Sequence, residues 1–173
     1  MWNATKYAVP FVLFCCLASG IAGACFGVRF NITPSVPIGL YRYTDRKDAP
    51  YIAVCPTGVA EQVSIERNYR PQGRGCPDGY APMLKPVTAR PGDIVTVAHH
   101  VVYVNHHLLA NSRIYSQDGL KRAMPQLADG EYIVKPGTLW AVSTYNPHSF
   151  DSRYFGPISD KEVIHHVVPV LFF

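Results

Sequence analysis

Charged residues are scarce in this chain: Asp, Glu, Lys and Arg make up 16% of its 173 residues, and the formal net charge is +4 at pH 7. An excess this small and this scattered does not form the basic patch of a nucleic-acid-binding protein, so no nucleic acid partner is expected. Glycine motifs that bind dinucleotides or phosphates are also missing, as are repeats and low-complexity tails. No cofactor is therefore predicted.

A Cys-x-x-Cys motif is missing as well, and the seven histidines do not replace it as metal ligands. All of them except His148 form adjacent pairs, at 99–100, 106–107 and 165–166. Neighbouring residues of a strand point to opposite faces, so such a pair cannot close on one ion. Because the usual ligand spacing is absent too, we expect no metal site.

Charge is absent throughout residues 7–28. About 20 predominantly apolar residues suffice to cross a bilayer as a helix, and a proline such as Pro10 is tolerated at the start of one. We therefore predict a signal-anchor helix at about residues 7–28, within a membrane anchor of residues 1–30. Residues 31–173 are of ordinary length for one domain with a single hydrophobic core.

A cleaved signal peptide is the alternative interpretation of the N-terminal segment. Ala22-Gly23-Ala24 offers a small-residue cleavage site, but the apolar run is longer than the roughly 7–15 residues usual for such peptides. Cleavage would leave Cys25 first, yet Ala22 fits a lipobox poorly, which argues against lipidation.

The remaining chain consists of short runs of branched and aromatic residues divided by Gly, Pro and Asn, which predicts a mostly β domain. The expected strands are residues 38–43, 51–54, 83–88, 93–97, 101–104, 108–110, 131–134, 138–143 and 163–172. One helix is expected at 59–67, where Val59, Val63 and Ile65 have helical spacing. Residues 68–81, dense in Gly, Pro and Arg, are expected to form a loop, either a lid beside the site or a solvated connection.

Ser35 and Lys85 are the residues most suggestive of chemistry. Pro34 and Pro37 flank the serine and stiffen its backbone. A serine becomes nucleophilic when a base takes its proton, and a lysine can be that base if burial lowers its pKa toward neutrality, by up to about 3–5 units. Lys85 lies in an apolar run that precedes a Pro-Gly-Asp turn, where such desolvation is expected. A histidine base is the alternative, with His148 the best placed in sequence.

Three blocks of the sequence together resemble the bacterial type I signal peptidases, and more closely the TraF-type proteases of conjugative transfer systems. They are Pro34-Ser35-Val36-Pro37-Ile38-Gly39-Leu40-Tyr41, Lys85 with Pro91-Gly92-Asp93, and residues 146–156, which contain Ser149-Phe150-Asp151-Ser152-Arg153. Two departures favour the specialised TraF branch. Val36 stands where general signal peptidases have methionine, and Ser143-Thr144-Tyr145-Asn146 replaces most of a Gly-Asp-Asn lead.

The resemblance implies a role for each matching residue. Ser35 would be the nucleophile, with its backbone N–H stabilising the oxyanion, and Lys85 the general base. Thr33 would complete the oxyanion hole, and Ser149 would orient the lysine amine. Asp151 and Arg153 would form a structural ion pair, which fits their spacing because residues two apart on a strand share a face.

The family topology places the domain outside the cytoplasm, which the charges flanking the apolar segment do not decide. We therefore expect an inner-membrane protein with its catalytic domain in the periplasm. An oxidising compartment favours a disulfide between Cys55 and Cys76, the two cysteines outside the apolar segment. The fold implied is that of signal peptidases, with coiled antiparallel sheets.

The function implied is that of a Ser-Lys endopeptidase which processes a conjugative pilin precursor. Some members of the branch also cyclise the product, and the sequence leaves open whether this chain does. Partners would be that precursor or another secretory precursor, the membrane, and other pilus assembly proteins. Two alternatives remain open: a general signal peptidase that removes leader peptides, and a catalytically idle assembly factor.

Overall fold

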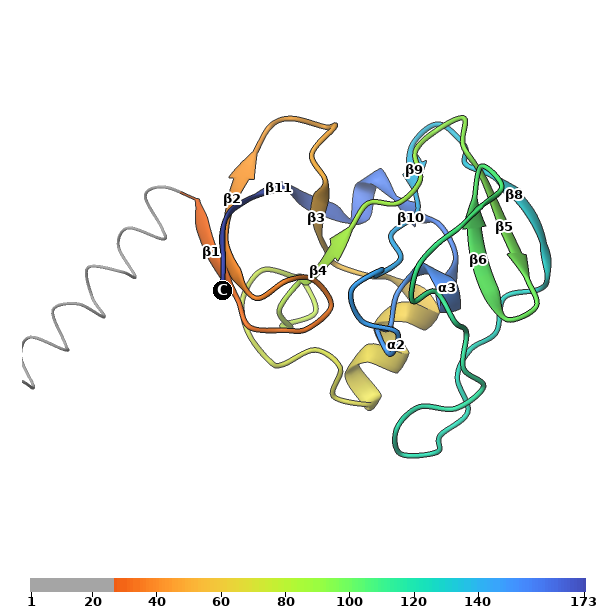
Figure 1. The fold of residues 1–173 in the computed structure, drawn as a ribbon. Coiled ribbons are helices and arrows are strands. Elements are labelled where there is room, and N and C mark those ends of the chain that lie inside the picture. Colours follow the sequence, from red (N-terminus) through yellow and green to blue (C-terminus); the bar gives the residue numbers. More distant parts are fainter. Residues whose placement is uncertain (1–26) are drawn as a thin grey trace, which may run out of the picture.

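The computed structural model describes residues 27–173, and its fold is mostly β, as predicted (Figure 1). One sheet has five strands in the order β1-β2-β11-β3-β4, and all its pairings are antiparallel. Its strands are β1 (Val28–Asn31), β2 (Gly39–Thr44), β3 (Tyr51–Val54), β4 (Met83–Pro86) and β11 (Val163–Phe172). β1 and β4 are its two edges, and Arg29 of β1 donates to the Pro82 carbonyl beside β4, so the sheet curls its edges toward each other.

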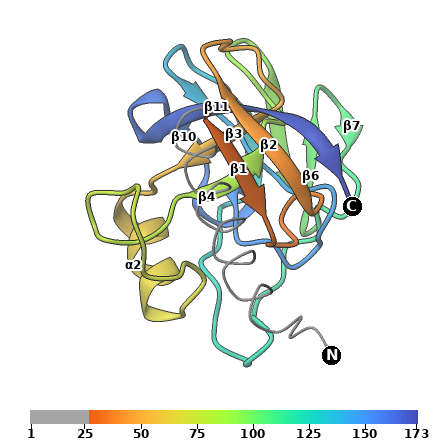
Figure 2. The same ribbon diagram turned by 90° about the vertical axis from the view of Figure 1, so that its left-hand side faces the viewer.

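A second antiparallel sheet of four strands has the order β7-β6-β5-β8, and a third consists of β9 and β10 (Figure 1). Their strands are β5 (Ile94–Ala98), β6 (Val101–Val104), β7 (His107–Leu108), β8 (Gly130–Ile133), β9 (Thr138–Leu139) and β10 (Ile158–Ser159). The helices are α2 (Gly58–Glu66), α3 (Ser152–Phe155) and the 3-10 turn η1 (Asp160–Glu162). Figure 2 shows β1, β2 and β11 side by side.

The strand β3 is buried on both faces, as its uninterrupted apolar run indicates. Ala53 packs with Val36 and Tyr41 inside the curl of the five-stranded sheet. Ile52 packs on the other face against β9 and β10. The largest apolar cluster lies around Trp140, between the four-stranded sheet and the segment that leads into α3. Packing on both faces fixes the register of β3 and of its neighbour β4.

Two expected strands are shorter in the structure for identifiable reasons. The predicted strand 83–88 ends at Pro86, because Thr88 and Ala89 donate instead to the Trp140 carbonyl. The predicted strand 138–143 is regular only over β9, because Ala141 exchanges hydrogen bonds with the backbone and hydroxyl of Ser152. The N–H and the hydroxyl of Ser152 thus take the place of a partner strand beside Ala141.

The adjacent histidine pairs were expected to lie in strands, where one pair cannot close on a single ion. That expectation is wrong, because two of the three pairs do not lie wholly within strands. His99 and His100 form the two-residue turn between β5 and β6, with φ of 53° and 61°. Asn105 and His106 form the turn between β6 and β7, with φ of 50° and 66°. Left-handed residues at both positions are typical of mirror-image hairpin turns. Within residues 27–173 no group of three His, Cys, Asp or Glu side chains is arranged to hold a metal ion.

The predicted anchor helix, the cleavage site at Ala22-Gly23-Ala24 and the lipidation site at Cys25 lie outside the described residues, except for the last two helix positions. Val28, predicted as the end of the helix, is instead the first residue of β1, because it pairs with Arg42 of β2. Among the described residues no helix is long and apolar enough to cross a membrane.

Candidate active site

Ser35 lies in the connection between β1 and β2, which we call the nucleophile loop (residues 32–38). Asn31, buried at the end of β1, holds this loop through its side-chain amide. Its Nδ2 donates to the carbonyls of Thr33, Pro37 and Val36, at 2.8, 3.2 and 3.4 Å. Its Oδ1 accepts from the backbone N–H and the hydroxyl of Thr33, at 3.2 and 2.7 Å. The loop therefore has one backbone arrangement although it belongs to no sheet.

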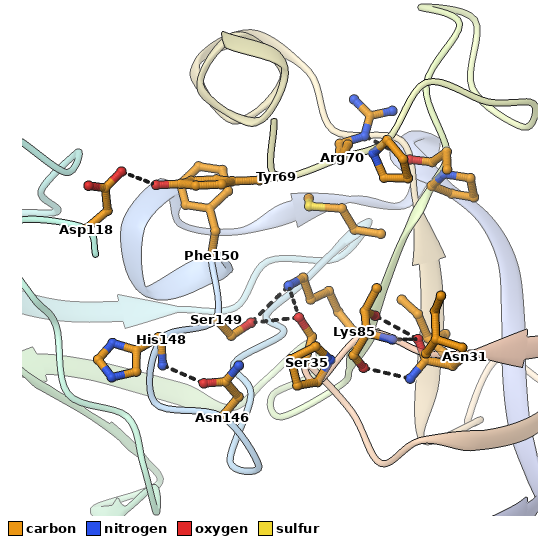
Figure 3. Close-up of a pocket in the computed structure, with 18 of the residues that line it drawn as sticks. Asn31, Ser35, Tyr69, Arg70, Lys85, Asp118, Asn146, His148, Ser149 and Phe150 are labelled. Atoms are coloured by element: carbon orange, nitrogen blue, oxygen red, sulfur yellow. Dashed lines mark hydrogen bonds between the residues drawn. The ribbon is translucent and has the colours of Figure 1, made fainter. Parts of the chain in front are cut away.

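The structure brings Lys85 and Ser149 to Ser35 (Figure 3). Lys85 lies on β4 opposite Ile52, and its Nζ is 3.0 Å from the Oγ of Ser35 and 2.9 Å from the Oγ of Ser149. The two hydroxyl oxygens are 3.4 Å apart. A basic amine thus contacts a serine hydroxyl directly, and a second hydroxyl fixes the direction of the amine.

Burial changes the acid–base properties of Lys85. Only 4% of the residue is exposed. Desolvation disfavours the ammonium form and lowers the pKa of Lys85 from 10.5 to about 8, against the opposing charge of Asp151. An amine of this pKa is neutral in about one molecule in ten at pH 7. Lys85 can therefore accept a proton at physiological pH, which an exposed lysine cannot.

Asp151 and Arg153 form a fully buried ion pair with two contacts, Nε to Oδ1 at 2.8 Å and Nη2 to Oδ2 at 3.0 Å. The pairing was expected, but its geometric reason is different. Asp151 is the N-cap of α3 and accepts from the Arg153 N–H, so these residues are not on one face of a strand. Arg153 also donates to the carbonyls of Asn111, Pro147 and Ser143, at 2.8, 2.9 and 2.7 Å. The pair therefore joins separate segments around the site.

Ser143 is a site residue that sequence reasoning missed. Its hydroxyl donates to the Ser35 carbonyl at 2.6 Å. Its N–H donates to Asp151, and its carbonyl accepts from Arg153. The available signal was its position at the start of the four residues that depart from the Gly-Asp-Asn lead.

The expected oxyanion groups are both near the nucleophile. The Ser35 N–H donates to none of the residues that the structure describes. The Thr33 hydroxyl, in contrast, donates to Asn31. Thr33 would have to exchange this bond for one to substrate before it could stabilise an oxyanion.

His148 does not contact Ser35. Its ring stacks on Tyr115 with centroids 4.8 Å apart, and its backbone N–H donates to Asn146. Figure 3 shows the imidazole directed away from the Ser35 hydroxyl. Lys85, and not His148, therefore contacts the Ser35 hydroxyl.

A cavity of about 600 Å³ opens in front of Ser35 and Lys85. β1 and the nucleophile loop form one wall and residues 81–85 another, while residues 115–119 and Tyr69 lie across from them. Tyr69 donates to Asp118 at 2.6 Å, and this bond, with those from Arg122, lowers the pKa of the Asp118 carboxyl. Apolar side chains line the middle of the cavity, among them Met83, Leu84, Met124, Phe150 and Tyr154.

The predicted disulfide between Cys55 and Cys76 is present. It joins the residue after β3 to the loop 68–81, which forms as predicted and contributes Arg70, Pro71 and Ala81 to the cavity wall. Arg70 is buried and paired with Asp78 at 2.6 Å within the same loop. The loop is therefore a fixed part of the cavity wall, and not only a solvated connection.

Comparisons with known proteins identify the family of this chain. The family model described as "Signal peptidase, peptidase S26" matches residues 2–172. The plasmid transfer protein TraF of Escherichia coli is 32% identical over 155 residues, covering 87% of this chain and 88% of that protein. The conjugal transfer protein TraF of Agrobacterium fabrum is 35% identical over 159 residues, covering 88% and 87%.

Among solved structures, the signal peptidase I of Enterococcus faecalis aligns with 17% identity and a TM-score of 0.37, covering 72% of this chain and 97% of that one. We draw nothing further from a score this low. The family model matches residues 2–172, which include the three blocks, and the two TraF proteins each match most of the sequence. The chain therefore belongs to the signal peptidase family, peptidase S26.

Proposed function

We propose that this protein is a serine endopeptidase with a Ser35–Lys85 dyad that processes a pilin precursor in conjugative transfer. One observation carries the proposal: a buried lysine with a pKa of about 8 contacts the hydroxyl of a serine in a fixed loop. Family membership supports a peptidase, and the TraF relatives support a role in conjugation.

In the proposed reaction, neutral Lys85 takes the Ser35 proton as Oγ attacks the scissile carbonyl carbon. The tetrahedral oxyanion is stabilised by the Ser35 N–H and by the Thr33 hydroxyl once it leaves Asn31. Lys85 then gives its proton to the departing amine as the C–N bond breaks, which leaves an acyl-enzyme. Each oxyanion donor of this kind contributes about 10²–10³ in rate.

Deacylation uses the same lysine in the reverse sense. Neutral Lys85 takes a proton from water, the resulting hydroxide attacks the ester, and Ser35 leaves with the proton from Lys85. If the amino terminus of the substrate attacks instead of water, the product is a circle and one water fewer is consumed. Ser149 keeps the amine directed at Ser35 through both half-reactions, because its hydroxyl contacts Nζ at 2.9 Å.

The substrate strand is proposed to bind between β1 and β4. Both are edge strands of the described sheet and line the cavity, and an extended peptide can add to such an edge. The alternation of side chains in the added strand then selects residues that face the cavity. We further propose that the apolar N-terminal segment before β1 anchors the protein in the inner membrane with this cavity on the periplasmic side, where the Cys55–Cys76 bridge would persist.

Intact-mass spectrometry of a candidate pilin precursor, incubated with the protein or with its Ser35→Ala variant, tests the proposal. A serine-dependent product with the mass of the linear fragment indicates hydrolysis, and one lighter by a water indicates cyclisation. Unchanged precursor with both proteins, together with normal pilus assembly by Ser35→Ala in cells, would favour an idle assembly factor. Cleavage of many unrelated secretory precursors would favour a general signal peptidase.

A further inference from the structure

We infer that Ser143 is a positioning residue that holds the nucleophile loop in its reactive arrangement. This inference rests on the proposed function, and it explains a residue that the three family blocks leave without a role. Ser143 is fully buried, and its hydroxyl donates to the carbonyl of Ser35 at 2.6 Å, across 108 positions of sequence.

The backbone of Ser143 is fixed from two sides by one ion pair. Its N–H donates to Oδ2 of Asp151 at 2.9 Å, and its carbonyl accepts from Nη2 of Arg153 at 2.7 Å. Hydrogen bonds to charged groups are stronger than neutral ones, and this pair has no exposed surface. The ion pair thus determines the direction of the Ser143 side chain, and the hydroxyl of that side chain in turn holds the carbonyl of Ser35 in place.

The bond to the Ser35 carbonyl constrains the nucleophile itself. Fixing this carbonyl fixes the peptide plane between Ser35 and Val36, and so the direction of the Ser35 Cα–Cβ bond. Asn31 holds the carbonyls on either side, those of Thr33 and Val36. Asn31 therefore locates the loop, and Ser143 sets the orientation of the reacting residue within it.

The hydroxyl of Ser143 has a second use. It accepts from the N–H of Asn146 at 3.0 Å and of Tyr145 at 3.3 Å, which closes the turn that leads to His148 and Ser149. The Ser143 hydroxyl therefore positions two parts of the site. It holds the turn that leads to Ser149, which orients the Lys85 amine, and it holds the backbone of Ser35, which bears the nucleophile. A small shift of either would lengthen the contacts of Lys85, and misplacement by about 1 Å can reduce a rate about 100-fold.

Ser143→Ala tests the inference, with Ser64→Ala as the matched control. Ser64 is also fully buried, and its hydroxyl also donates to a backbone carbonyl, that of Glu61 at 2.8 Å in α2. We expect Ser143→Ala to lower kcat about 10- to 100-fold with KM changed less than about twofold. The midpoint of the acidic limb of the rate profile should stay where the wild type has it, because Lys85 keeps the burial that lowers its pKa. Ser64→Ala should keep wild-type kcat.

A second measurement does not depend on turnover. With the Ser35 carbonyl labelled with carbon-13, Ser143→Ala should shift its NMR resonance through loss of the hydrogen bond, and Ser64→Ala should not. An unchanged resonance or an unchanged kcat would overturn the inference. A loss of kcat accompanied by a displaced acidic limb and a lower Tm would also overturn it, since Ser143 would then be merely structural. A wild type without Ser35-dependent cleavage refutes the proposed function instead, while the resonance still reports the contact.

Discussion

The Nζ of Lys85 lies 3.0 Å from the Oγ of Ser35, and 50 positions of sequence separate these residues. The serine is in a loop beyond one edge strand of the five-stranded sheet, and the lysine is on the other edge strand. Their meeting is therefore a result of the curl of that sheet. The same curl buries Lys85, which links the geometry of the pair to the pKa of the lysine.

The activity should depend on pH through Lys85. Burial lowers the pKa of Lys85 to about 8, so the fraction of neutral base rises tenfold per pH unit below that value. We expect kcat/KM to increase with pH and to level off above pH 8. A pH–rate profile with a soluble peptide substrate measures this. Full activity maintained below pH 5 would contradict a neutral-lysine base.

Removal of the lysine amine should stabilise the protein while it abolishes catalysis. The folded-state pKa of about 8 is below the value of 10.5 expected in the unfolded chain, so the unfolded state binds more protons between these values. Below pH 8 the burial of Lys85 lowers the free energy of unfolding by its full amount, about 3 kcal/mol. This cost decreases as the pH rises from 8 and vanishes above 10.5.

Lys85→Met should therefore raise the free energy of unfolding at pH 7 by up to this amount. Urea denaturation at pH 7 and at pH 10.5 measures the difference. The gain should shrink toward zero at the higher pH. An equal gain at both values would mean that the methionine acts through packing and not through the removed charge.

The Asp151–Arg153 pair should be essential for stability. Arg153→Leu leaves the buried Asp151 carboxylate without its partner, which typically costs about 3–5 kcal/mol. The matched control is Arg46→Leu, because Arg46 and Asp48 have the same spacing and a 2.9 Å contact but are 69% exposed. That change should alter stability by less than about 1 kcal/mol. Thermal unfolding of both variants compares them, and equal losses would argue that burial of the pair is unimportant.

The disulfide should stabilise the cavity wall. Cys55 and Cys76 are 21 positions apart, and closing a loop of this size contributes about 3 kcal/mol. The double variant Cys55→Ser/Cys76→Ser should lose about that much stability in urea denaturation. Reductant should lower the stability of the wild type to the same level and leave the double variant unchanged. A wild type insensitive to reductant would show that the bridge carries no stability.

The parts of the fold that the sequence predicts are those with a local signal. The apolar run at residues 51–54 predicts β3, and the spacing of Val59, Val63 and Ile65 predicts α2. α3 has no such signal, because its four residues are too few for a helical period. Its position depends on Asp151, whose carboxylate caps it while also binding Arg153.

The residues of the candidate site also divide into those that have a signal in the sequence and those that do not. Ser35, Lys85 and Ser149 are predicted because each lies in a block that resembles the signal peptidases, and the structure brings the three together. Ser143 could not be recognised in this way. Its contact is with a backbone carbonyl, which every residue has, so nothing in the sequence marks the partner. The ion pair of Asp151 and Arg153 was expected, but from strand geometry that the helix cap replaces.

The position of β11 in the sheet has a consequence for biosynthesis. β11 pairs with β2 on one side and β3 on the other, so the strands next to the nucleophile loop and to Lys85 are joined only through it. Among the described strands it is also the last to be synthesised. Until then the pairs β1–β2 and β3–β4 are not joined into one sheet, and Ser149 and the ion pair also lie late in the sequence. In a growing chain Ser35 and Lys85 are therefore both present before β11 joins their strands, and we expect their contact to form only when the sheet is complete.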